Sequence, residues 1–87
     1  MHEASLMAGL MRQLDEVSRR EDATRIVAVS VWLGALSHLS PGHFARHFEV
    51  AARGTIAEGA RLHTTISDDL EHPIAQGLLL ESVEVEA

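Results

Sequence analysis

Apolar side chains recur every three or four positions near the start of the chain. The repeat consists of Leu6, Leu10, Leu14 and Val17, with charged side chains between them. This spacing is that of one face of an α-helix. We therefore expect an amphipathic helix over about residues 4–20.

A run of β-branched and apolar residues at 25–33 indicates a strand. Alternation predicts two faces, with Val27, Val29, Val31 and Leu33 on one and Ile26, Ala28, Ser30 and Trp32 on the other. Because both faces are largely apolar, we expect this strand at the centre of a sheet or against a partner.

A second helix is predicted to begin at Pro41. Ser40 suits the capping position, and Pro fits the first helical position, where its missing N–H costs nothing. Phe44 and Phe48 mark the buried stripe of this helix, and Gly54 is its expected stop.

The later apolar segments predict strands at about 60–67 and 78–85, joined by a loop at 68–77. Their apolar faces are expected to be Leu62, Thr64 and Ile66 in the first, and Leu79, Val83 and Val85 in the second. The element order is α-β-α-β-β, and the middle β-α-β unit should make two parallel strands by a right-handed crossover. The predicted fold class is α+β, a two-layer sandwich with two helices on one face of a three-stranded mixed sheet.

Charge and composition argue against several classes of function. A net charge of −6 argues against a nucleic-acid partner, because an acidic chain gains nothing at phosphates. No apolar run approaches the ~20 residues that span a membrane, and no signal peptide is recognised, so we expect a cytoplasmic protein. With six histidines and no cysteine, a metal site would use nitrogen and oxygen ligands.

The opening residues Met1, His2 and Glu3 offer a chelate for a metal ion. The Met1 amine, the His2 backbone nitrogen and the His2 imidazole can bind one ion, and the Glu3 nitrogen or a nearby side chain can complete the set. Ni(II) and Cu(II) accept planar nitrogen coordination, whereas Zn(II) prefers a tetrahedron. A frayed, solvated chain start is the alternative.

Other histidines are weaker candidates. His43 and His47 lie four residues apart on the second predicted helix, so both imidazoles share one face. No third ligand is evident near them in the sequence, and two exposed histidines are the alternative. A hydrolase built on this pair lacks a nucleophile. His72, in the loop, is a further candidate ligand.

Five stretches resemble the HypA/HybF family of hydrogenase and urease nickel-insertion metallochaperones. They are residues 1–6, 27–34 with Leu36 and Ser37, 41–49, 54–62 and 78–86. They occur in the family's order and together cover most of the chain. The resemblance implies a nickel-binding domain with two helices on a three-stranded sheet.

The resemblance also implies a function. In this family Ni(II) is bound by the His side chain and the backbone nitrogens of the opening residues, here Met1, His2 and Glu3. The expected role is nickel delivery to the large subunit of [NiFe]-hydrogenase, with a nickel-loading GTPase as partner. The protein is then not an enzyme.

One departure from the family is large. Members carry a zinc ribbon with four cysteines between the last two strands, where this chain has only the loop 68–77. Residues 1–87 are therefore expected to form a single nickel-binding domain without zinc. His72 could replace a nickel ligand found near that junction in some members, and Ser40 stands where some members carry an acidic residue.

Two further hypotheses remain open. A chain without the ribbon could be a metal-independent docking module for the hydrogenase large subunit or the GTPase, using the second face of the first strand. The exposed edge of the closing strand could also pair with a second copy to form a homodimer.

Overall fold

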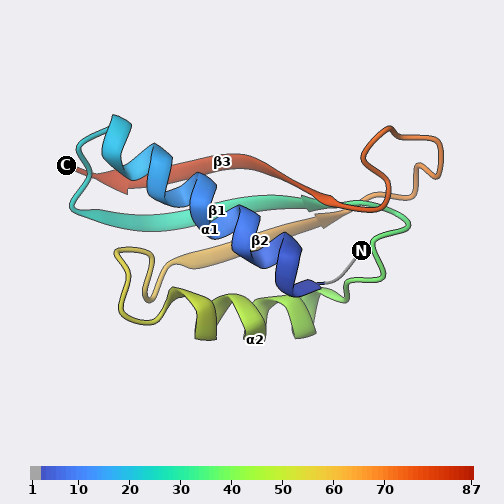
Figure 1. Cartoon of the computed structure of the whole chain (residues 1–87), viewed down its shortest axis with the longest axis horizontal. Coiled ribbons are helices and arrows are strands. Elements are labelled where there is room, and N and C mark those ends of the chain that lie inside the picture. The colour runs from blue at the N-terminus through green and yellow to red at the C-terminus, as the bar shows by residue number, and fades with distance from the viewer. Residues whose placement is uncertain (1–2) are drawn as a thin grey trace.

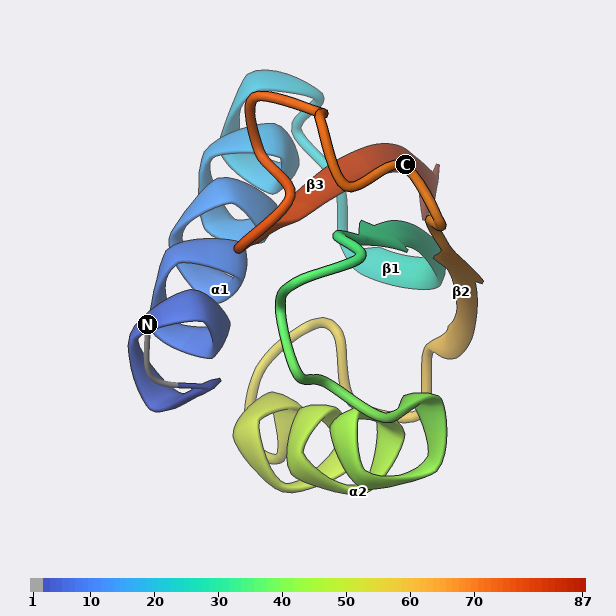
Figure 2. The ribbon, with the colours of Figure 1, turned by 90° about the vertical axis from the view of Figure 1, so that its right-hand side faces the viewer.

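A computed structural model describes residues 3–87, and Met1 and His2 lie outside the described residues. The elements are α1 (Glu3–Arg20), β1 (Arg25–Leu33), α2 (Pro41–Ala52), β2 (Arg61–Ile66) and β3 (Leu78–Glu86). Both helices cover the same face of the sheet (Figure 1, Figure 2). The predicted α+β class and the order α-β-α-β-β are confirmed, with boundaries within one or two residues of those expected.

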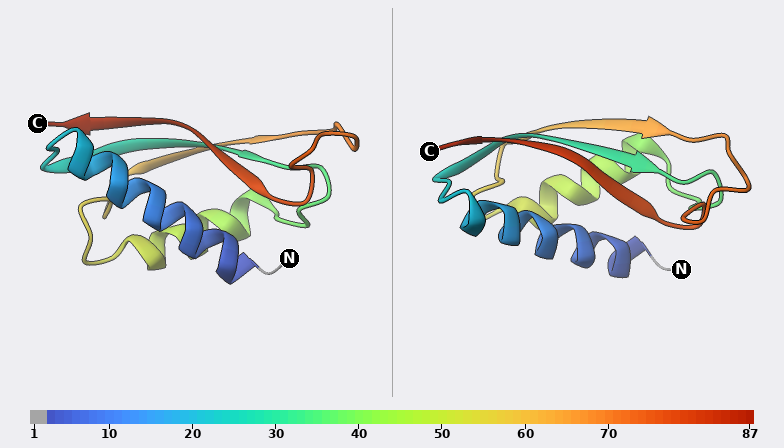
Figure 3. Two further views of the ribbon diagram at one scale, coloured as in Figure 1. Left: turned by 45° about the horizontal axis from the view of Figure 1, so that its top comes forward. Right: turned by 90° about the horizontal axis from the view of Figure 1, so that it is seen from above.

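The sheet formed by the described residues has the strand order β2-β1-β3. β1 pairs with β2 in parallel and with β3 in antiparallel orientation, so the apolar strand is central, as its sequence predicts. β3 lies at an edge of this sheet, and the pairing of that edge with a second copy stays a prediction. Figure 3 shows the twisted sheet above the two helices.

The core lies between this sheet and the two helices. Its largest fully buried side chains are Phe44, Leu10, Leu14, Ile26, Leu33, Val29 and Val31. Three elements supply these residues, so burial of apolar surface holds both helices to the central strand. This packing fixes where the first turn of α1 lies relative to α2.

The predicted faces of β1 and β3 are wrong at Ile26 and at Leu79, and irregular pairing explains both errors. The pairing of β1 with β3 shifts register between Ile26 and Ala28 and again between Ser30 and Val31. The first shift places Ile26 in the core at 1% exposure rather than on the outer face. The second leaves Leu79 exposed, while Leu78 and Leu80 pack against the core. Such β-bulges interrupt the alternation on which the prediction relied.

The loop between β2 and β3 is held against the end of β1. Gly34 donates its N–H to the carbonyl of Gly77 (2.9 Å), and Leu36 donates to the carbonyl of Ala75 (2.7 Å). A Cβ at Gly34 would lie 2.2 Å from the Ala75 carbonyl oxygen. Only glycine allows the two backbones to approach this closely.

Candidate metal site

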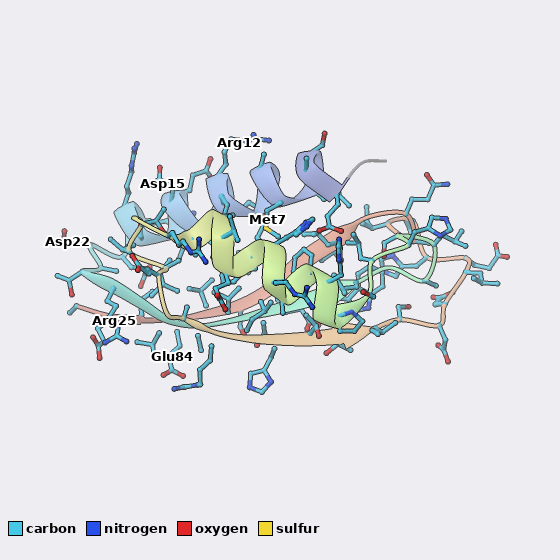
Figure 4. The ribbon with its side chains drawn as sticks, turned by 90° about the horizontal axis from the view of Figure 1, so that it is seen from below. Met7, Arg12, Asp15, Asp22, Arg25 and Glu84 are labelled. Atoms are coloured by element: carbon cyan, nitrogen blue, oxygen red, sulfur yellow. The ribbon has the colours of Figure 1, made fainter. Side chains whose placement is uncertain are left out.

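Glu3 opens α1 on the side of the helix that faces α2. It precedes Met7 by four residues, so the two side chains share one face of the helix. Met7 is buried and lies between α1 and α2, whereas Arg12 and Asp15 point away from α2 (Figure 4). The α1 face that carries Glu3 is therefore packed against the second helix.

The second helix presents His43 and His47 beside its buried stripe. Ser40 caps α2 and accepts a hydrogen bond from the His43 N–H (3.3 Å), with Pro41 at the helix start. Phe44 and Phe48 are buried, and each is preceded by one of the two histidines, which are both exposed. The two imidazole rings are neighbours, with their centroids 4.3 Å apart.

The packing of α1 on α2 brings these three side chains together. The Oε2 atom of Glu3 forms an ion-pair contact with Nδ1 of His47. One ligand atom from each of Glu3, His43 and His47 lies within 4.8 Å of the others. The sequence spacing indicates the pair His43 and His47. It does not indicate Glu3 as the third member of the cluster, because Glu3 is distant along the chain.

The Glu3 carboxylate is the most enclosed member of this cluster. Its side chain is 19% exposed, against 49% for His47. Among residues 3–87 its Oε2 atom is buried without a hydrogen-bond partner, and its polar neighbour is Nδ1 of His47. A buried carboxylate oxygen without such a bond is costly unless a cation lies beside it.

Of the three residues expected to form the chelate at the chain start, the structure describes only Glu3. Met1 and His2 lie outside the described residues, so their role as ligands stays a prediction. Glu3 begins α1, and the first N–H groups of a helix have no acceptor within that helix. Its backbone nitrogen can therefore serve a metal without disrupting the helix.

His72 does not belong to the Glu3 cluster. Its Nδ1 accepts the N–H of Ile74 (2.9 Å), and its ring lies 4.5 Å from that of Trp32. These contacts leave Nε2 as its remaining ligand atom. Its loop lies at the same end of the molecule as the start of α1 (Figure 1). Its role as an extra ligand stays a prediction.

Two observations concern a zinc ribbon and a membrane-spanning helix. The chain contains no cysteine, so a four-cysteine zinc ribbon cannot be built from these 87 residues. Within residues 3–87, no helix combines the length and the apolar character that a membrane crossing requires.

Comparisons with known proteins give consistent results. A family described as "Hydrogenase/urease nickel incorporation, metallochaperone, hypA" matches residues 1–70. The hydrogenase maturation factor HypA of Methylocella silvestris is 39% identical over 66 residues, 76% of this chain and 58% of that protein. The HypA of Acidithiobacillus ferrooxidans is 39% identical over 62 residues, 71% and 55% of the two chains. The chain thus spans just over half the length of these curated relatives.

Solved structures share the fold. The solution structure of the Ni metallochaperone HypA from Helicobacter pylori matches with a TM-score of 0.80 at 19% identity, covering 100% of this chain and 99% of that one. A second HypA solution structure matches with a TM-score of 0.73 at 19% identity, covering 98% and 96%. At this identity the likeness concerns the fold alone.

Proposed function

The chain belongs to the HypA family of hydrogenase and urease nickel-incorporation metallochaperones, and on that premise we propose that it carries Ni(II) on its own first residues. The ligands are the amine of Met1, the backbone nitrogen and imidazole of His2, and the backbone nitrogen of Glu3. The family is one of metal delivery, in agreement with the prediction that the chain is not an enzyme.

The observation that carries this proposal is the position of Glu3 at the first residue of a packed helix. Met1 and His2 directly precede it in the sequence. The helix end repels a bare cation, because its partial charge is positive. Each amide nitrogen that loses its proton on binding brings a negative charge, which offsets that repulsion. Planar coordination by such nitrogens suits Ni(II).

The proposed recipient is the large subunit of [NiFe]-hydrogenase, with a nickel-loading GTPase as partner, in the cytoplasm. This assignment rests on the family's role in hydrogenase and urease maturation. No zinc ribbon takes part in this role, since these 87 residues contain no cysteine.

The test is a Ni(II) titration followed by visible absorption, with a free Met1 amine. Planar Ni(II) bound to amide nitrogens gives a yellow band, and loosely bound imidazole complexes do not. We expect the band to saturate near one equivalent. It should vanish in His2→Ala and when residues are added before Met1, with the circular dichroism of the fold unchanged. An identical band in both variants would refute the proposal.

A second function has one observation in its favour. Large apolar side chains are exposed around the loop between β2 and β3: Leu36, Ile66, Leu70, Ile74 and Leu79. Exposed apolar surface of this kind is typical of a docking site. A metal-independent docking module for the same hydrogenase subunit or GTPase would use it. Capture of either partner by chelator-treated protein, unchanged by added nickel, would favour docking over delivery.

A further inference from the structure

We propose that Glu3, His43 and His47 form a second metal site, which binds a divalent transition-metal ion through side chains alone. This site shares Glu3 with the chelate at the chain start, but it uses the Glu3 carboxylate, whereas the chelate uses the Glu3 backbone nitrogen. The inference rests on the proposed function only for its choice of Ni(II) as the probe ion.

Side-chain movement alone can bring the three groups to the spacing that an ion requires. One ligand atom from each residue lies within 4.8 Å of the others. Neighbouring ligands on one ion lie about 3–3.6 Å apart, because each metal–ligand bond is about 2.1 Å long. The more widely spaced side chains must therefore close by at most about 2 Å, while Glu3 and His47, which are already in contact, must move apart. Both imidazoles are exposed and can turn, while the packed helices hold their Cα atoms in place.

The carboxylate gives an independent reason for a cation at this point. Oε2 of Glu3 is buried and, within the described part of the chain, lacks a hydrogen-bond partner. Its polar neighbour is a ring nitrogen of His47. A metal ion could be coordinated by both atoms once they move apart from this direct contact. The alternative is a simple ion pair with a protonated His47, which would bind no metal and would not involve His43.

The ligand set selects the class of ion. Two imidazoles and one carboxylate form a site that suits borderline divalent ions, with the remaining positions open to water. Without thiolate, the site has no preference for soft ions such as Cu(I). Ni(II) held this way with added waters is six-coordinate and paramagnetic, whereas planar Ni(II) is diamagnetic. The two sites can therefore be distinguished in one sample.

The experiment uses the full chain and Ni(II) as its chloride salt. Four proteins are compared: the chain with a free Met1 amine, a form extended before Met1, the double variant His43→Asn/His47→Asn, and a matched control, His38→Asn/His63→Asn. The control removes two exposed histidines outside the cluster, and Asn tolerates the positive φ of 60° at position 38. Equilibrium dialysis gives the stoichiometry, and paramagnetic broadening in NMR spectra gives the position of the ion.

We expect the chain with a free Met1 amine, called the free-start chain below, to bind about two equivalents of Ni(II), as two ligand sets allow. One of these ions should be planar and coloured, and the other should be paramagnetic. The extended form should lose the coloured ion and keep broadening around His43 and His47. The His43→Asn/His47→Asn variant should lose the broadening, and the control should behave like the parent chain. Equal paramagnetic binding by the double variant and the control would overturn the second site. Absence of the coloured ion alone would overturn the chelate proposal and leave this site standing.

Discussion

Glu3, the first residue of α1, is in ion-pair contact with His47, on the second turn of α2. The contact joins the start of the chain to a helix that begins almost forty residues later. It exists because Met7, Leu10 and Leu14 bury the same side of α1 against the core. Apolar packing thus positions the end of the molecule that carries the proposed metal ligands.

Nickel should stabilise the folded chain. Glu3, His43 and His47 meet only when α1 packs on α2, so an ion bound there favours the folded state. At a free concentration one hundred times its dissociation constant, an ion adds about 2.7 kcal/mol to the free energy of unfolding. Thermal denaturation with Ni(II) or with chelator measures this. His43→Asn/His47→Asn with an extended start should show no rise, and a rise equal to the parent's would contradict both sites.

Gly34→Ala should destabilise the fold by about 1–3 kcal/mol, because an overpacked contact forces backbone to move. The added Cβ would lie 2.2 Å from the Ala75 carbonyl oxygen, in the loop that closes over β1. Urea denaturation followed by circular dichroism measures the loss. Gly42→Ala is the matched control, since its Cβ meets nothing within 4 Å and helices favour Ala. Similar losses in both would mean that the loop does not pack as described.

Ser40→Ala should lower the free energy of unfolding by about 1 kcal/mol, which is typical for loss of a helix cap. The Ser40 hydroxyl accepts the His43 N–H at 3.3 Å, so it fixes the first turn of the helix that carries both histidines. Ser40→Thr keeps the acceptor and should retain most of the stability. Equal destabilisation by Ala and Thr would show that the hydroxyl does not act as a cap.

His72→Ala should loosen the loop between β2 and β3 at a cost of about 1 kcal/mol, the usual value for one hydrogen bond. It removes the acceptor for the Ile74 N–H and the ring beside Trp32. The fluorescence of Trp32, the chain's only tryptophan, should change. His63→Ala, at an exposed residue of β2, should leave it unaltered. Unchanged emission in His72→Ala would contradict the ring contact.

The same His72→Ala protein addresses the ligand prediction. If Nε2 of His72 is an extra ligand of the nickel ion, the visible band of the complex will shift in this variant. A band identical to the parent's would show that His72 does not bind the ion.

Much of the fold follows from sequence patterns alone. The Leu6 to Val17 repeat predicts α1, and Ser40 with Pro41 predicts the start of α2 at the observed residue. The apolar run at 25–33 is the central strand, as expected. These signals are local, because periodicity and capping depend on residues within a few positions of one another.

The incorrect or missing predictions concern residues whose positions depend on partner strands or on distant elements. Alternation assigned Ile26 and Leu79 to faces that two register shifts reverse, and a bulge leaves no clear mark in one strand's sequence. The pair His43 and His47 was visible from its spacing, but its carboxylate partner Glu3 was not. That contact depends on how α1 packs on α2, which the helical periodicity of either segment does not specify.

X-ray absorption spectroscopy of the free-start chain with one equivalent of Ni(II) tests the central proposal most directly. We predict about four nitrogen or oxygen neighbours in a planar arrangement, with a single imidazole from His2. A six-coordinate spectrum with two imidazoles would contradict the account, because the first ion would then occupy the His43 and His47 pair instead of the chain start.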